Sequence, residues 1–415
     1  MDKNFKISNI RGREILDSRG NPTIEAEVCL ECGVKASASV PSGASTGGWE
    51  ACEKRDGDLA RYNGKGTLRA VGGIEGEIRD CLLKMDARDQ TGIDLSLCAL
   101  DATADKSRLG ANAILAVSLA CAKSAAKAAC IPLYKYLGGV GKAELPIPTM
   151  NVINGGAHAG NGLDTQEFMI IPVGRTRFHE MLQMCTEVYY ALKKLVKSDG
   201  VGDEGGFAAD LGTDEEAIEK LLEGIKKAGF EPEDDFVIGL DAAVSEWYDV
   251  KRGVYTQPKS GRTFSSDELV GKWVALCEKY PIFSLEDGCA DRDTSGWKKL
   301  TKELGRKIQL VGDDLFVTNA ERIRNGMENN IANAVLIKPN QVGTLTETIE
   351  AIRVAKRGGY NCIMSHRSGE TEDTFIADLA VAFNIGMVKF GAPCRTDRVA
   401  KYNRLLRIED EMRMK

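Results

Sequence analysis

The sequence predicts an α/β protein in which a smaller α+β domain precedes a large barrel of alternating strands and helices. The main evidence is a repeat in the C-terminal half, where six apolar runs each end in a polar residue. Five of these residues are spaced by 313 − 286 = 27, 338 − 313 = 25, 366 − 338 = 28 and 389 − 366 = 23 positions. Such a step accommodates one strand, one helix and two loops, so it indicates a repeated βα unit. The six runs end at Asp241, Glu286, Asp313, Lys338, His366 and Lys389.

Length and composition support the same architecture. The 415 residues are too many for one ordinary core, whereas a barrel plus one smaller domain fits. Hydrophobic residues make up 43% and charged residues 28%, as in soluble globular proteins. The net charge of −6 gives no basic field, so we expect no nucleic-acid partner.

The location of the protein is predicted from what its segments lack. No stretch reaches the ~18 consecutive apolar residues of a membrane helix, so no membrane span is expected. The N-terminus MDKNFKISNI has no apolar signal core, so export is not expected. The twelve cysteines of a chain this long are typical of reduced, buried thiols. We therefore expect a cytoplasmic protein.

Residues 1–135 are expected to form the α+β domain, and residues 136–415 the barrel. Within the first domain, residues 68–85 and 110–130 have helical patterns, and the second is so rich in Ala and Leu that we expect it to be buried on most sides. The Gly-rich stretch PSGASTGG at 41–48 has too little apolar surface for a core element. It is expected to be a lid or a solvated loop.

Two helices of the second half are predicted to begin at threonine. Thr318 with Glu321, and Thr344 with Glu347, have the spacing of a capping box, in which the two side chains satisfy backbone N–H groups at the start of a helix.

The three carboxylates at the first strand ends predict a metal site. In a βα barrel the C-terminal ends of neighbouring strands point into one mouth, so Asp241, Glu286 and Asp313 would converge there. Carboxylates brought together repel one another unless a cation lies among them. A set of oxygen ligands suits Mg²⁺. Any one of these residues alone is more often a helix cap or an ion-pair partner, so the prediction depends on all three occurring together.

Lys338 is the candidate general base. It follows the apolar run AVLI directly, and a strand buried on both faces would point this side chain into the barrel mouth. Nearby cations would lower its pKa and allow it to accept a proton near neutral pH. The alternative is an ordinary surface lysine.

Three Gly-rich loops and one strand start add further polar candidates. Each signal is weak alone, because Gly-rich loops are common. The acid in GDEGG is the most specific, since its flanking glycines leave few side chains to shield it. The candidates are Ser45 in SGASTGG, His158 in GGAHAGNG, Glu204 in GDEGG, and Gln166 and Glu167 in QEFMI.

Together these motifs resemble the enolase family. SGASTG, GGAHAGN, QEFMI, GDEGG, SLEDG, GDDLFVTN, LIKPNQ, SHRSGETEDT and RVAKYNRLLRIE occur in the order typical of that family, from about residue 4 to 410. The resemblance implies an α+β capping domain followed by an eight-stranded barrel of ββαα(βα)6 order. It also implies a lyase of glycolysis and gluconeogenesis, which converts 2-phosphoglycerate to phosphoenolpyruvate with two Mg²⁺ per site.

The resemblance also implies roles for the candidate residues. Asp241, Glu286 and Asp313 would hold the first metal, and Ser45 would help to hold the second. Lys338 would take the C2 proton, while Glu204 would protonate the leaving C3 hydroxyl with Glu167 beside it. Lys389 would contact the substrate carboxylate, and Arg367 with Ser368 the phosphate. His158 and His366 would complete the pocket, and Gln166 would support the acid.

Three features of the sequence depart from the family pattern, and two alternative functions stay open. Trp49 stands where many relatives have a polar residue, Cys394 where a small Ser or Ala is usual, and the chain ends soon after RIEDEM. One alternative is a related enzyme that acts on another carboxylate. The other is a surface-binding scaffold, with which the terminal Lys415 would be compatible. A homodimer or an octamer is expected by resemblance.

Overall fold

The computed structural model describes residues 4–43, 48–198 and 200–413. The predicted Ser45 and Lys415 therefore lie outside the described residues, as does half of the predicted lid, residues 44–47. Contacts between residues divide the chain into two compact units. Unit 1 comprises residues 1–144, 337–353 and 366–384, and unit 2 comprises residues 145–336, 354–365 and 385–415. The predicted division at residue 135 stays a prediction.

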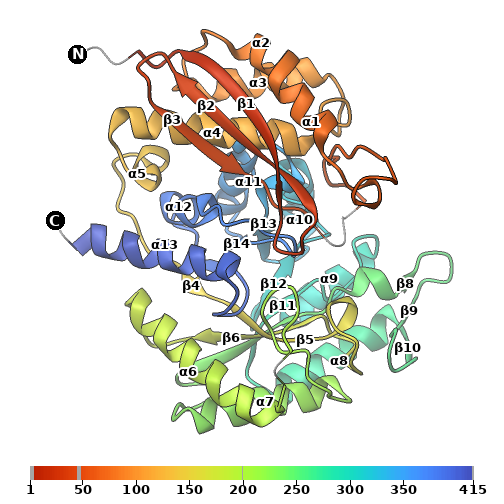
Figure 1. Ribbon diagram of the computed structural model, residues 1–415. Helices are drawn as coiled ribbons and strands as arrows, with labels where there is room; N and C mark the ends of the chain where they lie inside the picture. The colour runs from red at the N-terminus through yellow and green to blue at the C-terminus, as the bar shows by residue number, and fades with distance from the viewer. Residues whose placement is uncertain (1–3, 44–47, 199, 414–415) are drawn as a thin grey trace. The chain divides into compact units, whose positions relative to one another are not determined.

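Unit 1 contains an antiparallel three-stranded sheet in the order β1-β2-β3 (Figure 1). In β2 the apolar side chains Ile24, Ala26 and Val28 are buried while the alternate glutamates are partly exposed, because successive side chains of a strand point to opposite faces. Helix α4 packs along β2 and β3 and is buried on nearly every side, as its Ala-rich sequence predicts. The strands are β1 (Ile7–Leu16), β2 (Pro22–Leu30) and β3 (Lys35–Ser39).

The helices of unit 1 confirm the predicted helical regions with one difference. The segment expected to be one helix over 68–85 is two short helices joined by a π-helical turn at Ile74–Ile78, where Gly76 leaves helical geometry. Glycine adopts such backbone angles more readily than other residues. The helices that lie in this unit are α1 (Leu68–Gly73), α2 (Arg79–Leu82), α3 (Gln90–Asp101), α4 (Ala111–Ala129), α5 (Leu133–Gly138) and α12 (Phe375–Ala382), and α11 (Leu345–Arg357) begins in it.

Unit 2 is built on a nine-stranded sheet in the order β4-β15-β14-β13-β12-β11-β7-β6-β5. Strand β6 is antiparallel to both of its neighbours, whereas the pairs β7–β11, β11–β12, β12–β13 and β14–β15 are parallel. The strands are β4 (Ile147–Pro148), β5 (Met150–Asn154), β6 (Glu167–Pro172), β7 (Phe236–Asp241), β11 (Ile282–Glu286), β12 (Gln309–Gly312), β13 (Ala334–Ile337), β14 (Asn361–Ser365) and β15 (Met387–Lys389).

The order of elements along the chain from β5 onward, which includes α11 and α12, confirms the predicted barrel. Strands β5 and β6 are followed by two helices before β7, and six βα pairs follow, as in ββαα(βα)6. A small antiparallel sheet of three short strands lies between β7 and its helix. The helices are α6 (Phe178–Val196), α7 (Asp214–Lys227), α8 (Ser266–Lys279), α9 (Thr294–Leu304), α10 (Ala320–Glu328) and α13 (Thr396–Arg413), and the short strands are β8 (Tyr248–Asp249), β9 (Val254–Thr256) and β10 (Thr263–Ser265).

The barrel is nearly closed by the segment that contains β4 and β5, which are separated only by Thr149. Strand β4 pairs with β15, while β5 pairs with β6 at the other end of the sheet order. The Thr149 N–H donates to the Val388 carbonyl at 2.7 Å. A buried cluster brings Ile171 of β6 together with side chains of β12 to β15, which are not neighbours of β6 in the sheet, so these side chains meet through the interior: Val311, Ala334, Leu336, Ile363 and Met387.

No helix among the described residues is long and apolar enough to cross a membrane.

Asp373 is a buried carboxylate that ties together three elements of unit 1. Its oxygens accept hydrogen bonds from the Ser39 N–H at 2.9 Å, the Phe375 N–H at 2.8 Å and the Lys123 ammonium at 2.8 Å. Burial alone would raise the pKa of Asp373, but Lys123 and the backbone donors outweigh burial and lower the pKa below its usual value.

We therefore expect Asp373→Asn to lower the free energy of unfolding by roughly 2 kcal/mol at pH 7. A carboxylate whose pKa is depressed on folding stabilises the folded state above its unfolded pKa. That contribution is lost as the pH falls through the folded value. The difference from the parent should therefore shrink below about pH 3.8. Urea denaturation across this pH range measures the difference in unfolding free energy between the variant and the parent. Asp210→Asn, in an exposed loop, is the control. An equal loss at every pH would contradict the assignment.

Candidate active site

Four charged side chains of unit 2 lie at one rim of the barrel sheet. Asp241, Glu286 and Lys389 are the last residues of the strands β7, β11 and β15, and Asp241 is paired in register with Glu286. Glu167 is the first residue of β6, which runs antiparallel to β7, and it is paired with Asp241. The start of an antiparallel strand and the ends of parallel strands therefore meet at the same edge, and all four side chains are buried.

Lys389 is the cation at the centre of this group. Its Nζ lies 2.8 Å from Glu286 Oε2, 2.9 Å from Asp241 Oδ2 and 3.1 Å from Glu167 Oε2. Burial alone would lower the pKa of Lys389, but the carboxylates of Asp241, Glu167 and Glu286 raise it well above its ordinary value. One buried ammonium thus faces three carboxylates, which leaves an excess of negative charge for another cation to balance.

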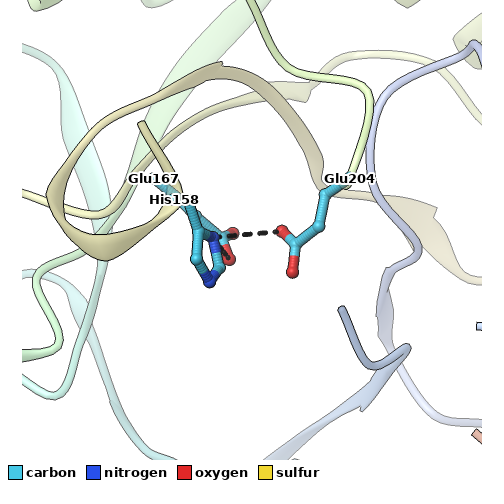
Figure 2. Close-up of side chains that lie close together, drawn as sticks. All are labelled: His158, Glu167 and Glu204. Carbon is cyan, nitrogen blue, oxygen red and sulfur yellow. Dashed lines mark ion pairs between the residues drawn. The ribbon is translucent and has the colours of Figure 1, made fainter. Parts of the chain in front are cut away.

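A second group is formed by Glu167 together with His158 and Glu204 (Figure 2). The His158 Nδ1 atom is 3.9 Å from Glu167 Oε1 and 3.9 Å from Glu204 Oε2. The Asn151 amide of β5 donates to Glu204 Oε2 at 3.0 Å. Burial first, and then the nearby Glu204 carboxylate, raise the pKa of Glu167 well above its usual range. A raised carboxyl pKa favours the protonated form, which is what a proton donor requires.

The predicted Gln166 and Asp313 lie beside these groups. Gln166 precedes β6, is mostly buried, and donates its backbone N–H to the Asp241 carbonyl at 2.9 Å. Asp313 follows β12 directly and is half-buried.

Asp287 is a residue of this site that sequence reasoning missed. Its two carboxylate oxygens accept hydrogen bonds from the Asp313 N–H at 3.1 Å and the Asp314 N–H at 2.9 Å. Burial first, and then the charges of Asp314, Asp313 and Glu286, raise the pKa of Asp287 well above its ordinary value. Asp287 thereby holds the chain at the end of β12 and sets the position of Asp313. The sequence feature that could have indicated Asp287 is its position directly after Glu286 in SLEDG.

Among the residues that the structure describes, side chains of unit 2 form two groups that could hold a metal ion. Ligand atoms of Asp287, Asp313 and Asp314 lie within 4.8 Å of one another, as do those of the group formed by His158, Glu167 and Glu204. The predicted trio with Asp241 and Glu286 shares Asp313 with the first group. The charges of Glu286 and Asp241 also contribute to the raised pKa of Asp287.

The remaining predicted residues belong to unit 1, and they are Lys338, His366, Arg367 and Ser368. Lys338 follows β13 in an extended conformation and is half-buried, and His366 and Ser368 are buried. The Arg367 guanidinium binds both carboxylate oxygens of Glu50, at 2.8 and 3.2 Å. Arg367 also donates to the Asn340 side chain at 3.1 Å. Glu50 and Asn340 were not predicted as partners of Arg367.

Comparison with known protein families matches nearly the whole chain. Residues 7–137 match the family model described as the enolase N-terminal domain. Residues 142–415 match the model described as the enolase C-terminal TIM barrel domain. Both matches agree with the α+β unit and the ββαα(βα)6 barrel described above. The chain therefore belongs to the enolase family.

Proposed function

We propose that this chain is a phosphopyruvate hydratase, a Mg²⁺-dependent lyase that reversibly dehydrates 2-phosphoglycerate to phosphoenolpyruvate in glycolysis and gluconeogenesis. The observation that carries the proposal is the buried charge at the barrel rim, where Lys389 contacts three carboxylates. Burying so many opposite charges together costs free energy, because they lose their contacts with water. Such a group is typical of a site that holds a metal and an anionic substrate.

The acidic residues fit Mg²⁺ as the metal. Asp241, Glu286 and Asp313 offer only oxygen donors, which Mg²⁺ prefers. Lys389 acts as a stand-in cation, because its ammonium contacts two of these carboxylates directly. We assign the first Mg²⁺ to this trio, and a second to a site to which Ser45 contributes. When bound, Mg²⁺ supplies positive charge that stabilises a developing anion, an effect of several kcal/mol.

The chain's own residues move the two protons in this proposal. A proton next to a carboxylate is weakly acidic because its removal adds a second negative charge to that group. Lys338 takes this proton from C2. Glu204, held by Asn151, gives a proton to the leaving C3 hydroxyl, and Glu167 lies beside it.

The other predicted residues bind the substrate. We assign the carboxylate to Lys389 and the phosphate to Arg367 with Ser368. The pairing of Arg367 with the Glu50 carboxylate supports this assignment, because a guanidinium that binds two carboxylate oxygens can bind two phosphate oxygens in the same way. We assign further substrate contacts to His158, His366 and Gln166. A cytoplasmic homodimer or octamer belongs to the same proposal.

The proposal is tested by adding 2-phosphoglycerate and Mg²⁺ and following phosphoenolpyruvate by ultraviolet absorbance. A related enzyme acting on another carboxylate would leave 2-phosphoglycerate unchanged but would exchange the α-proton of its own substrate. A scaffold protein without turnover would do neither.

Removal of divalent metal is expected to stop turnover, and added Mg²⁺ to restore it. Asp313→Asn should raise the Mg²⁺ concentration for half-maximal activity by at least about tenfold, because one ligand charge is lost and each 1.4 kcal/mol of affinity is a factor of ten. Titration calorimetry with Mg²⁺ should show the same weakening, and Asp210→Asn serves as control. Full turnover in excess chelator would refute the metal requirement.

A further inference from the structure

The backbone of the loop that carries Glu204 is held at three successive carbonyl groups. The Asp203 carbonyl accepts from the Arg398 guanidinium at 2.9 Å. The Glu204 carbonyl accepts from the Ala392 N–H at 2.9 Å. The Gly205 carbonyl accepts from the side chains of Tyr189 and Cys394. Three consecutive carbonyls with side-chain or backbone donors leave this loop little freedom to shift along the chain direction.

Tyr189 and Cys394 are the two donors to Gly205. The Tyr189 hydroxyl lies 2.8 Å from the Gly205 oxygen, and the Cys394 Sγ lies 3.4 Å from the same atom. The hydroxyl and the thiol are also 3.2 Å apart. Burial raises the pKa of the Tyr189 hydroxyl, so it stays protonated and remains a donor.

The direction of the Tyr189 hydroxyl is fixed by packing. Tyr189 lies on α6, only 6% of it is exposed, and its ring stacks on Phe207 with centroids 4.5 Å apart. Phe207 follows the acid loop directly, and its backbone pairs with Val152 of β5. The phenol therefore cannot rotate away from Gly205 without breaking this stack.

The thiol of Cys394 fills the remaining space against Gly205. Gly205 has a φ of +85°, which is unfavourable for other residues. A Cβ at this position would lie 2.8 Å from the Cys394 Sγ and 3.1 Å from the Ala392 Cβ. The loop is thus confined on the side of Cys394, while Asn151 holds the Glu204 carboxylate at its other end.

We infer that Tyr189 and Cys394 are positioning residues for Glu204, and that they act by clamping the Gly205 carbonyl so that the Glu204 carboxyl stays aligned with the leaving hydroxyl. The inference rests on the proposed function. Neither side chain would touch the substrate, and neither would take part in removal of the C2 proton. Their loss should therefore slow hydroxyl departure and spare the earlier proton transfer.

The test separates these two steps. Tyr189→Phe removes only the hydroxyl and keeps the ring. We expect kcat to fall roughly 3- to 10-fold, since one hydrogen bond is lost. KM should stay within about twofold, and the rate of C2 deuterium exchange should be unchanged. The ratio of exchange to turnover should therefore rise by the factor that kcat falls.

The thiol provides an independent variant with a conservative partner. Cys394→Ala should lower kcat in the same selective way, whereas Cys394→Ser retains a donor and should recover at least part of the loss. Tyr190→Phe, at the neighbouring and largely exposed tyrosine, and Cys81→Ser, at an exposed cysteine, are the matched controls. Neither control should change the exchange-to-turnover ratio.

The outcomes distinguish this inference from the proposed function. Exchange and turnover that fall together in both Tyr189→Phe and Cys394→Ala would overturn the positioning role, because a general loss of structure would explain them. Unchanged kcat in both variants would also overturn it. If the parent protein does not convert 2-phosphoglycerate, the proposed function itself fails, and the role of these residues in it fails as well.

Discussion

Replacing Lys338 by alanine is expected to abolish both deuterium exchange at C2 of 2-phosphoglycerate and formation of phosphoenolpyruvate. The assigned base is then missing, and a positioned base contributes about 10²- to 10⁴-fold to the rate. Substrate should still bind, because the substitution removes a group used in the transition state. Nuclear magnetic resonance in deuterated water measures the exchange, and ultraviolet absorbance measures the product.

Glu204→Gln should separate the two reactions. Loss of the hydroxyl should stop because glutamine cannot donate a carboxylic proton, while C2 exchange continues because Lys338 is intact. Lys142→Ala is the control, since its side chain is 86% exposed. Wild-type exchange in the Lys338 variant would show that another residue is the base.

Lys389→Met is expected to have the largest effect on stability. It leaves the carboxylates of Asp241, Glu286 and Glu167 buried together without their shared ammonium. Removing one partner of a buried ion pair typically costs about 3–5 kcal/mol. We expect the free energy of unfolding to fall by about this amount in a chelating buffer, as measured by urea denaturation.

Added Mg²⁺ should return a large part of this stability, because a ligand that binds only the folded state shifts the equilibrium toward it. Lys142→Met on the surface should be unaffected under both conditions. A loss of stability that Mg²⁺ does not reduce would argue against a metal among these carboxylates.

Six strands of the barrel were predictable from the sequence because nearly all of their residues are buried, with Phe283 of β11 and Asn361 of β14 as the exposed exceptions. The six apolar runs that end at Asp241, Glu286, Asp313, Lys338, His366 and Lys389 correspond to the strands β7, β11, β12, β13, β14 and β15. A parallel strand covered on both sides must be apolar throughout, so its first polar residue marks its end. The same signal marks the side chains at the rim of the barrel, because they follow the apolar runs directly.

The local ends of helices were predicted less well. The capping box expected at Thr318 is wrong, because Asn319 caps α10 by accepting from the Glu321 and Arg322 N–H groups. At Thr344 the expected contact occurs, with the Glu347 N–H donating to the Thr344 hydroxyl at 3.1 Å. Neighbouring Thr and Asn residues are both good caps, and the fold decides between them.

The contacts that position the site could not be predicted from the sequence. Asp287 holds the backbone of Asp313 in the loop after the next strand. Tyr189 and Cys394 hold Gly205, from which they are separated by 16 and 189 residues in the sequence. Such contacts depend on which elements become neighbours in the barrel. No periodicity within one segment contains that information.

The way in which the barrel closes has a consequence for its folding. Thr149 is bonded to Val388, 388 − 149 = 239 residues later, and the residue after Val388 is Lys389. During synthesis, the acidic residues Glu167, Asp241 and Glu286 of β6, β7 and β11 therefore exist before the lysine that pairs with them. Contacts of such long range form late, because loop closure must precede them. We expect the unfinished barrel to be held open by its own negative charge until the last strand arrives, so that ring closure and partial balancing of this charge occur in one step.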